Sequence, residues 1–279
     1  MSVVRAALKT LPGRGGALLI GGLVAAALLG PGLAPFGPEQ CTLEAELAAP
    51  GRLHWLGADP DGCDIFSRLL HGARLSVLVG LTVVTVSVVT GTAIGLLAGL
   101  RGGKTDAALM FVLELFQAFP GFLIALAIVA TAPRPSVGLV IGALCVSGWV
   151  GYARLVRGQA LVLRDAEYVT AARALGFGEL RIALTQVLPN LLGPLTVQAT
   201  FGLAGAILAE AGLSFLGLGV PPGTPSWGAM LHQGRSYLLV APWLSVYPGV
   251  AIALTVFGFN LLGDALSDAL DPRRRGRSG

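Results

Sequence analysis

Charged residues are scarce in this chain of 279 residues. Only 12% of its residues are Asp, Glu, Lys or Arg, whereas soluble domains carry roughly 25%. Hydrophobic residues make up 54%, and the mean hydropathy is +0.77. The shortage of charge excludes a soluble globule, and the high hydrophobicity excludes intrinsic disorder. The remaining class is a multi-span membrane protein, in which six helices of roughly 20–25 residues would use about half of the chain.

The sequence also lacks the common motifs of catalysis. No stretch matches the phosphate loop GxxxxGK[ST], the zinc motif HExxH or a nucleophile elbow, and no paired catalytic carboxylates are found. The three histidines, His54, His71 and His232, are scattered, so we expect no metal site. We therefore expect neither an enzyme nor a cofactor in this chain.

Six apolar runs predict six membrane-spanning helices and an all-α fold. Arg5, Lys9 and Arg14 precede the first run, an arrangement that also fits a signal peptide. No small-x-small cleavage site follows it directly, so we interpret it as an uncleaved helix. The predicted spans are Ala17–Gly30, Leu75–Leu100, Ala107–Ala130, Val137–Tyr152, Leu191 to about Leu208, and Leu244–Leu262.

The positions of the basic residues predict the orientation. With the N-terminus in the cytoplasm, fourteen of the 19 Lys and Arg residues fall in inside segments. The outside segments hold only five, namely Arg52, Arg68, Arg74, Arg134 and Arg235. Because inside loops carry an excess of Lys and Arg, both termini are predicted to be cytoplasmic. We divide the chain into residues 1–74 (tail, first helix and outer loop), a core of residues 75–264 with five membrane spans and the inner loop 153–190, and a basic cytoplasmic tail of residues 265–279.

The outer loop, Pro31–Arg74, is too polar to span a membrane and is rich in Pro and Gly. We expect an extended cap over the outer mouth. Cys41 and Cys63 both lie in this loop, 22 residues apart. An extracytoplasmic pair can form a disulfide, which would staple a loop with few apolar contacts; two unrelated thiols are the alternative.

A mixed, charged stretch of residues 153–190 separates the fourth and fifth spans on the inner side. We predict a helix over Ala166–Leu175, a break at Gly176 and Gly178, and a short amphipathic helix over Glu179–Gln186 that Pro189 ends. Such a hairpin can insert into a groove of a soluble partner. An amphipathic linker at the membrane surface explains the pattern equally well.

Three polar residues fall at membrane depth. Glu114 and Gln117 lie three residues apart on one face of the third predicted span. Intramembrane ionisable residues often line a water-filled path, so both are candidates for its wall, although an interhelical polar pair is the preferred alternative. Glu210, near the outer end of the fifth span, is a third candidate; it could also brace the outer loop or lie at the interface.

Asp264 and Asp268 recur on one face of the last helix, close to its C-terminus. The helix dipole disfavours acidic residues there, so each needs a cationic partner. The predicted topology offers Arg154, Arg157 and Arg173. A solvated face is the alternative.

The inner stretch resembles the EAA loop of binding-protein-dependent ABC importer permeases. The match falls on TAARALG and the following LP, with Thr170 standing in place of the usual Glu and Gln186 in place of Ile or His. In that family the loop docks on the ATPase subunit. The resemblance therefore implies that contact with an ATPase is made by Ala171, Ala172, Gly176, Phe177, Leu180, Ile182, Leu188 and Pro189.

Three further blocks resemble the C-type permease of dipeptide, oligopeptide and nickel importers. They cover Leu56–Gly80, Ala209–Leu231 and Pro242–Arg273 in the same order as in that family, with Ala58 and Cys63 replacing its Thr and Arg. Together with the inner loop they cover about 40% of the chain. The resemblance implies an ABC importer type I permease fold in a bacterial cytoplasmic membrane.

The resemblance also implies the partners. They are a homologous second permease, two ATPase subunits that bind ATP and Mg, and an extracytoplasmic substrate-binding protein. Lipid surrounds the chain, and no nucleic acid is expected. A di- or oligopeptide is the favoured substrate, nickel or a nickel chelate is the alternative, and a secondary transporter is the alternative from another class.

Overall fold

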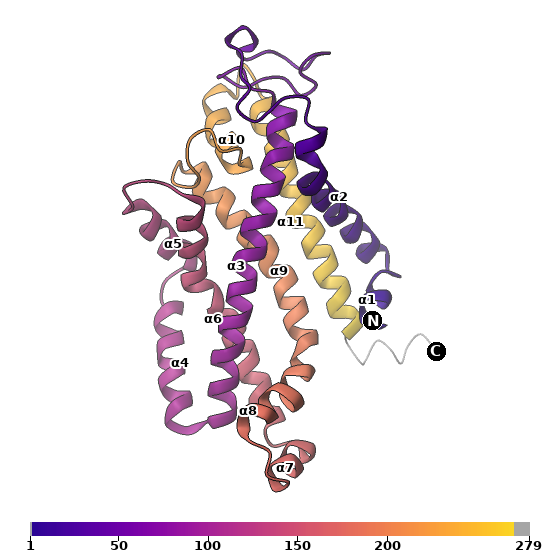
Figure 1. The fold of residues 1–279 in the computed structure, drawn as a ribbon, viewed down its shortest axis with the longest axis vertical. Helices are drawn as coiled ribbons and strands as arrows, with labels where there is room; N and C mark the ends of the chain where they lie inside the picture. The colour runs from indigo at the N-terminus through magenta and orange to yellow at the C-terminus, as the bar shows by residue number, and fades with distance from the viewer. Residues whose placement is uncertain (1, 271–279) are drawn as a thin grey trace.

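The computed structural model describes residues 2–270, so the basic residues Arg273, Arg274, Arg275 and Arg277 of the predicted tail lie outside the described residues. Helices dominate the described part, where the only strand-like pairings are two isolated bridges. The main elements (Figure 1) are α1 (Ser2–Ala7), α2 (Leu11–Leu33), α3 (Ile65–Arg101), α4 (Gly103–Gln117), α5 (Gly121–Ala130), α6 (Val137–Leu163), α7 (Glu167–Ala174), α8 (Glu179–Ile182), the π-helical segment η2 (Ala183–Val187), α9 (Leu188–Phe215), α10 (Trp227–Gly234) and α11 (Trp243–Leu270). Two short 3-10 turns, η1 (Leu43–Ala45) and η3 (Arg235–Tyr237), complete the set.

All six predicted apolar runs fall in helices. Five stretches are long and apolar enough to cross a membrane, and α4 with α5 gives a sixth crossing if this bent pair is counted as one span. Helix α3 has 37 residues, about 55 Å at 1.5 Å per residue. Because the hydrocarbon core is only about 30 Å thick, α3 extends well beyond it. Its first ten residues were expected in the outer loop; they are helical because the Asp64 carboxylate accepts a hydrogen bond from the Ser67 N–H (2.8 Å) and caps the helix.

The third predicted span is broken, not continuous. Helix α4 ends at Gln117, α5 begins at Gly121, and their axes differ by 70°. Pro120 explains the break, because it has no N–H to donate within the helix and restricts the residue before it.

Pro189 does not end a helix, contrary to our expectation. The helical path continues from Glu179 to Phe215 through η2, in which the Leu188 N–H donates to the Ala183 carbonyl five residues back. This wider turn re-arranges the backbone hydrogen bonds just before the proline.

Two helices extend beyond their predicted ends: α6 runs to Leu163 and α11 runs to Leu270.

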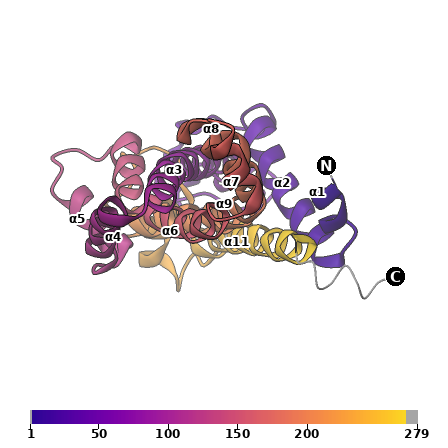
Figure 2. The same ribbon diagram turned by 90° about the horizontal axis from the view of Figure 1, so that it is seen from below.

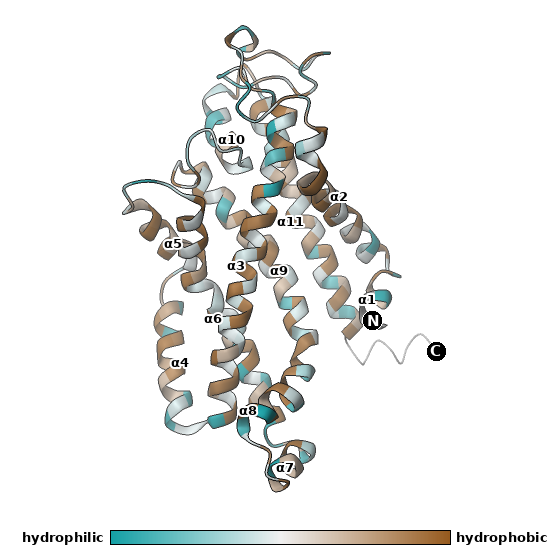
Figure 3. Ribbon diagram, in the orientation of Figure 1, coloured by the Kyte–Doolittle hydropathy of each residue, from teal (hydrophilic) through white to brown (hydrophobic). Residues whose placement is uncertain are grey.

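The bundle has two distinct ends. At the cap end lie residues 34–64 and α10, and at the hairpin end lie α7 and α8 (Figure 1). Seen from below, α4 and α5 lie at one edge and α1 at the other, with α3, α6 and α9 between them (Figure 2). Hydrophobic residues cover the long helices, whereas hydrophilic residues gather towards the two ends (Figure 3). This distribution is what a membrane-embedded bundle requires.

The most extensive helix packing among the described residues is between α3 and α6. Gly91, Gly95 and Gly99 recur every four residues along one side of α3 and are all buried. A Cβ atom at Gly95 would lie 2.6 Å from the Ala153 carbonyl oxygen, and one at Gly99 would lie 2.6 Å from the Ala160 Cβ. Small residues at this spacing let two membrane helices approach closely.

The cap end is held together by polar contacts and a covalent bond. Cys41 and Cys63 form a disulfide. The Asp59 carboxylate accepts hydrogen bonds from the Asp61 and Cys63 N–H groups, both at 2.9 Å, and pairs with Arg68 at the start of α3. These contacts order a loop that has little apolar surface to bury.

Replacing Gly95 by Leu should weaken the α3–α6 contact. The new side chain overlaps the α6 backbone, and overpacking of this kind costs about 1–3 kcal/mol. We expect a lower melting temperature of the purified protein in detergent. Gly158→Leu is the matched control, because a Cβ atom at Gly158 meets nothing within 4 Å. Equal melting temperatures of the two variants would contradict the proposed packing.

The cap disulfide can be tested by thiol labelling. In a variant with Cys145, the one free cysteine of the described chain, replaced by Ala, an impermeant maleimide should label intact cells only after a reductant is added. Labelling that is equally strong without reductant would show that Cys41 and Cys63 are not bonded.

Candidate functional site

The α7–α8 hairpin turns at Gly176, which has a φ of 81°. The Phe177 N–H donates to the Ala172 carbonyl (3.1 Å), and the Gly176 N–H donates to the Arg173 carbonyl (2.9 Å). These two bonds are the Schellman arrangement that ends a helix on a left-handed glycine. The predicted helix break at Gly176 is thus confirmed, and its positive φ would strain a β-branched residue at this position.

An ion pair braces the turn. The Arg173 guanidinium donates to both carboxylate oxygens of Glu179, at 2.8 and 3.3 Å, and to the Arg164 carbonyl at 3.1 Å. The hydrogen bonds to Glu179 raise the pKa of Arg173 further above its ordinary value. Arg181 also lies over the Phe177 ring, 4.1 Å from its centroid. The hairpin is thus an ordered element rather than a loose linker.

The structure separates the predicted coupling residues into two groups. Ala172 and Ile182 are buried, and Phe177 is half-buried, so these residues pack the hairpin against the bundle. Ala171, Gly176 and Pro189 are exposed, Leu180 is 74% exposed, and Leu188 is half-buried. Leu175, which is 77% exposed, and Leu180 flank the turn, and we call these two leucines the tip of the hairpin. Leu180 also lines a pocket with Leu97 and Leu100 of α3. Ala172, expected to make the partner contact itself, is buried.

The hairpin shares its core with the long helices. Val169 of α7, Ile182 of α8 and Val187 of η2 are all fully buried, in the same cluster as Val156 and Ala160 of α6. The hairpin therefore cannot move far without α6.

A second candidate site lies deep in the bundle, between α3, α5, α6 and α9. It is a pocket of about 270 Å³ whose polar lining residues are Ser87, Ser147, Tyr152 and Gln198. All the lining residues are uncharged. The Ser87 hydroxyl is buried and has no hydrogen-bond partner there. Sequence reasoning missed this pocket because isolated polar residues on three separate helices form no local pattern.

Glu114 and Gln117 lie on the surface of α4, and both are exposed in the isolated chain. Neither lines the deep pocket. A charged side chain on the lipid-facing side of a span is costly, so this side of α4 needs a polar partner or water.

Glu210 is fully buried where α9 meets α10. One carboxylate oxygen accepts hydrogen bonds from the hydroxyls of Ser214 (2.7 Å) and Ser226 (2.9 Å). Ser226 is also the N-cap of α10. The structure therefore places Glu210 as a brace between α9 and the cap end, one of the alternatives left open by the sequence.

The expected partners of Asp264 and Asp268 are largely engaged elsewhere. Arg157 forms two hydrogen bonds with Asp106 of α4, at 2.5 and 2.6 Å, and Arg173 pairs with Glu179. Helix α11 packs against α2, α9, α10 and α1, not against α7. The predicted pairing with Arg157 or Arg173 is thus not found among the described residues, where both arginines have other carboxylate partners. Figure 1 shows the C-terminal end of α11 beside α1, away from α7.

Comparison with known proteins identifies the family. The family profile described as "Binding-protein-dependent transport system inner membrane component" matches residues 91–276, which include the hairpin and most of the residues that line the deep pocket. The chain belongs to this family. It is accordingly a multi-pass protein of the bacterial inner membrane and an ABC importer permease, not a secondary transporter.

Relatives of this permease support the assignment along most of the chain. It is 43% identical to a putative peptide transport system permease of Brucella suis over 251 residues, 90% of this chain and 84% of the relative. It is 42% identical to the di/tripeptide permease DppC of Pseudomonas aeruginosa, covering 93% and 87%. It is also 42% identical to the glutathione permease GsiD of Pectobacterium atrosepticum, covering 80% and 74%.

The fold of the permease matches that of a solved transporter. A chain of the inward-facing methionine ABC transporter MetNI superposes with a TM-score of 0.60, covering 73% of this chain and 96% of that chain. At 18% identity, this likeness shows the fold alone. It confirms the expected type I importer permease architecture.

The brace at Glu210 can be tested by two substitutions. Glu210→Ala leaves the hydroxyls of Ser214 and Ser226 without their buried acceptor, which costs about 1–3 kcal/mol. Glu210→Gln keeps an oxygen at the acceptor position and should cost much less. Melting temperatures of the purified variants measure the difference. If Ala and Gln lower the melting temperature equally, the two hydrogen bonds do not hold the junction.

Proposed function

We propose that this permease forms the membrane channel of an ATP-driven importer of short peptides. A homologous second permease would complete the channel, and an extracytoplasmic binding protein would deliver the peptide at the cap end. Two ATPase subunits would bind ATP and Mg at the hairpin end, which faces the cytoplasm in this proposal. The peptide substrate is favoured over nickel because the three relatives described above are named for peptides.

The observation that carries the coupling role is the exposed apolar tip of the ordered hairpin. Leu175 and Leu180 are about three-quarters exposed, although a glycine turn and the Arg173–Glu179 ion pair hold them in place. Exposed apolar side chains on a rigid element favour insertion into a groove of a soluble partner. The shared core with α6 then gives a path by which motion of the ATPases would reach the spans.

The deep pocket supports the choice of peptide in a second way. Its polar groups, which include the Ser87 and Ser147 hydroxyls and the Gln198 amide, are neutral. Such groups can exchange hydrogen bonds with a peptide backbone without favouring either sign of side-chain charge. We propose this pocket as part of the path wall, and we propose that Glu114 and Gln117 face the path or the second permease. For Glu210 we propose the bracing role alone.

The coupling role is tested by Gly176→Val. A β-branched residue at a φ of 81° is strained by roughly 1–2 kcal/mol, so the turn should rearrange and the leucine tip should move. We expect normal insertion of the spans, but loss of ATPase co-purification or of substrate-stimulated ATP hydrolysis. Both are measured on complexes reconstituted in vesicles with the binding protein and a dipeptide.

Gly178→Val is the matched control. It adds the same side chain two residues further on, where φ is −67° and a Cβ atom meets nothing within 4 Å. It should leave both readouts close to those of the unaltered protein. If Gly176→Val also keeps normal co-purification and stimulated hydrolysis, the hairpin is only a linker.

A further inference from the structure

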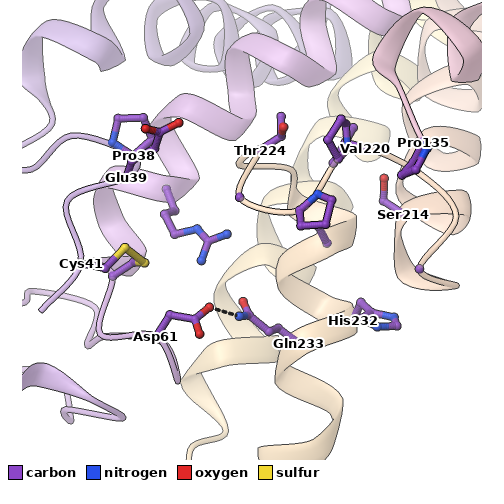
Figure 4. Close-up of a pocket in the computed structure, with 17 residues that line it drawn as sticks. Pro38, Glu39, Cys41, Asp61, Pro135, Ser214, Val220, Thr224, His232 and Gln233 are labelled. Carbon is purple, nitrogen blue, oxygen red and sulfur yellow. Dashed lines mark hydrogen bonds between the residues drawn. A yellow bond between two sulfur atoms is a disulfide. The ribbon is translucent and has the colours of Figure 1, made fainter. Parts of the chain in front are cut away.

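A pocket of about 500 Å³ opens at the cap end, away from the deep pocket described above. One wall comes from the disulfide loop and includes Glu39, Cys41 and Asp61, and the opposite wall includes Val220, Thr224 and His232 (Figure 4). The Gln233 amide of α10 donates to the Asp61 carboxylate across the floor at 2.6 Å. Four prolines stiffen the lining, namely Pro38, Pro135, Pro221 and Pro222.

The pocket contains one buried cation with an unused donor. Arg68 lines it and is only 6% exposed. Its Nη1 group donates to the Asp59 carboxylate, but its Nε–H has no hydrogen-bond partner among the described residues. An arginine side chain has five N–H donors in a planar fork that suits a carboxylate. The Nε atom is itself shielded from solvent, so a ligand in the pocket would bring its acceptor to the terminal nitrogen of Arg68 that Asp59 does not use.

The other lining groups restrict what that ligand can be. Arg68 and His232 are the only basic side chains in the lining, and the His232 Nδ1–H donates to the Phe215 carbonyl at 2.7 Å. Glu39 and Asp61 add two carboxylates to the walls. A simple anion would be repelled by these acids. A ligand that carries an ammonium group as well as a carboxylate would satisfy both kinds of charge.

We propose that this pocket binds a short zwitterionic peptide through its C-terminal carboxylate, with Arg68 as the group that binds the carboxylate. The inference rests on the proposed function and adds a substrate site on the permease itself. The volume lies within the range of pockets for small ligands, about 300–1,000 Å³. One acidic side chain of a docking protein would leave most of this space empty, so the pocket fits a peptide end better.

Direct binding tests the site. The complete permease–ATPase complex is placed in lipid nanodiscs without the binding protein, and the probe is the radiolabelled dipeptide alanyl-phenylalanine. Its C-terminal amide and acetate serve as comparison ligands. We expect the free acid to bind at least tenfold more tightly than the amide, and acetate not to compete.

Three variants locate the binding. Arg68→Gln removes the cation, and Thr224→Trp fills the pocket from a half-buried turn position and leaves both Arg68 and Asp59 in the sequence. Both should weaken binding of the free acid at least tenfold. Arg52→Gln removes an exposed arginine of the same loop that does not line the pocket, so it should bind normally. An intact disulfide and intact assembly, checked by mass spectrometry and gel filtration, show that each variant is folded.

The outcomes separate this inference from the proposed function. Equal binding of acid and amide, or normal binding by Thr224→Trp, overturns the site. A third outcome combines two results: the unaltered complex binds no peptide, and Thr224→Trp no longer docks the binding protein. That outcome also overturns the proposed site, and it assigns the pocket to an acidic side chain of the binding protein. ATP-driven dipeptide uptake with the binding protein present is measured in parallel. If uptake proceeds while binding fails, only this inference is lost; if uptake itself is absent, the proposed function fails.

Discussion

The close contact between α3 and α6 is the constraint on which the rest of the bundle depends. Three glycines on α3 bring its backbone against α6, and lipid supplies no hydrophobic force to press the helices together. Dispersion contacts at short range must do so, and they require the absence of side chains on α3. The same part of α6 carries Val156 and Ala160, which share a core with the hairpin. The position of the hairpin is therefore set by packing inside the membrane.

The cap end is organised by different forces. Its loop has few buried apolar side chains, and it is held by the Cys41–Cys63 disulfide, the Asp59–Arg68 pair and hydrogen bonds to backbone N–H groups. Glu210 joins the end of α9 to the start of α10 through two serine hydroxyls. Directional contacts of this kind fix geometry more closely than apolar contacts do. They leave a stiff-walled pocket open at the end where the substrate would arrive.

Much of the fold was predictable, but its interruptions were not. Apolar runs located every span, because the length of a membrane helix is set by the bilayer. The turn at Gly176 was also predicted, since only glycine adopts that conformation without strain. The structural effects of Pro120 and Pro189 were harder to predict. Both residues interrupt the backbone hydrogen bonds, yet Pro120 marks a 70° bend whereas Pro189 lies in a continuing helical path. The difference depends on whether the neighbouring turns can re-pair their carbonyls, as η2 does.

The sequence by itself determined the class of the protein, the number of apolar runs, the hairpin and the family resemblance. These properties follow from the amino-acid composition and from short local sequence patterns. The partners of charged side chains were decided only by the tertiary structure. Arg157 pairs with Asp106, 51 residues away, and not with the acids of α11, because α6 packs beside α4. The neutral deep pocket and the unused donor of Arg68 likewise arise from residues on separate elements. No local sequence pattern predicts these contacts, because they depend on how helices far apart in the chain pack together.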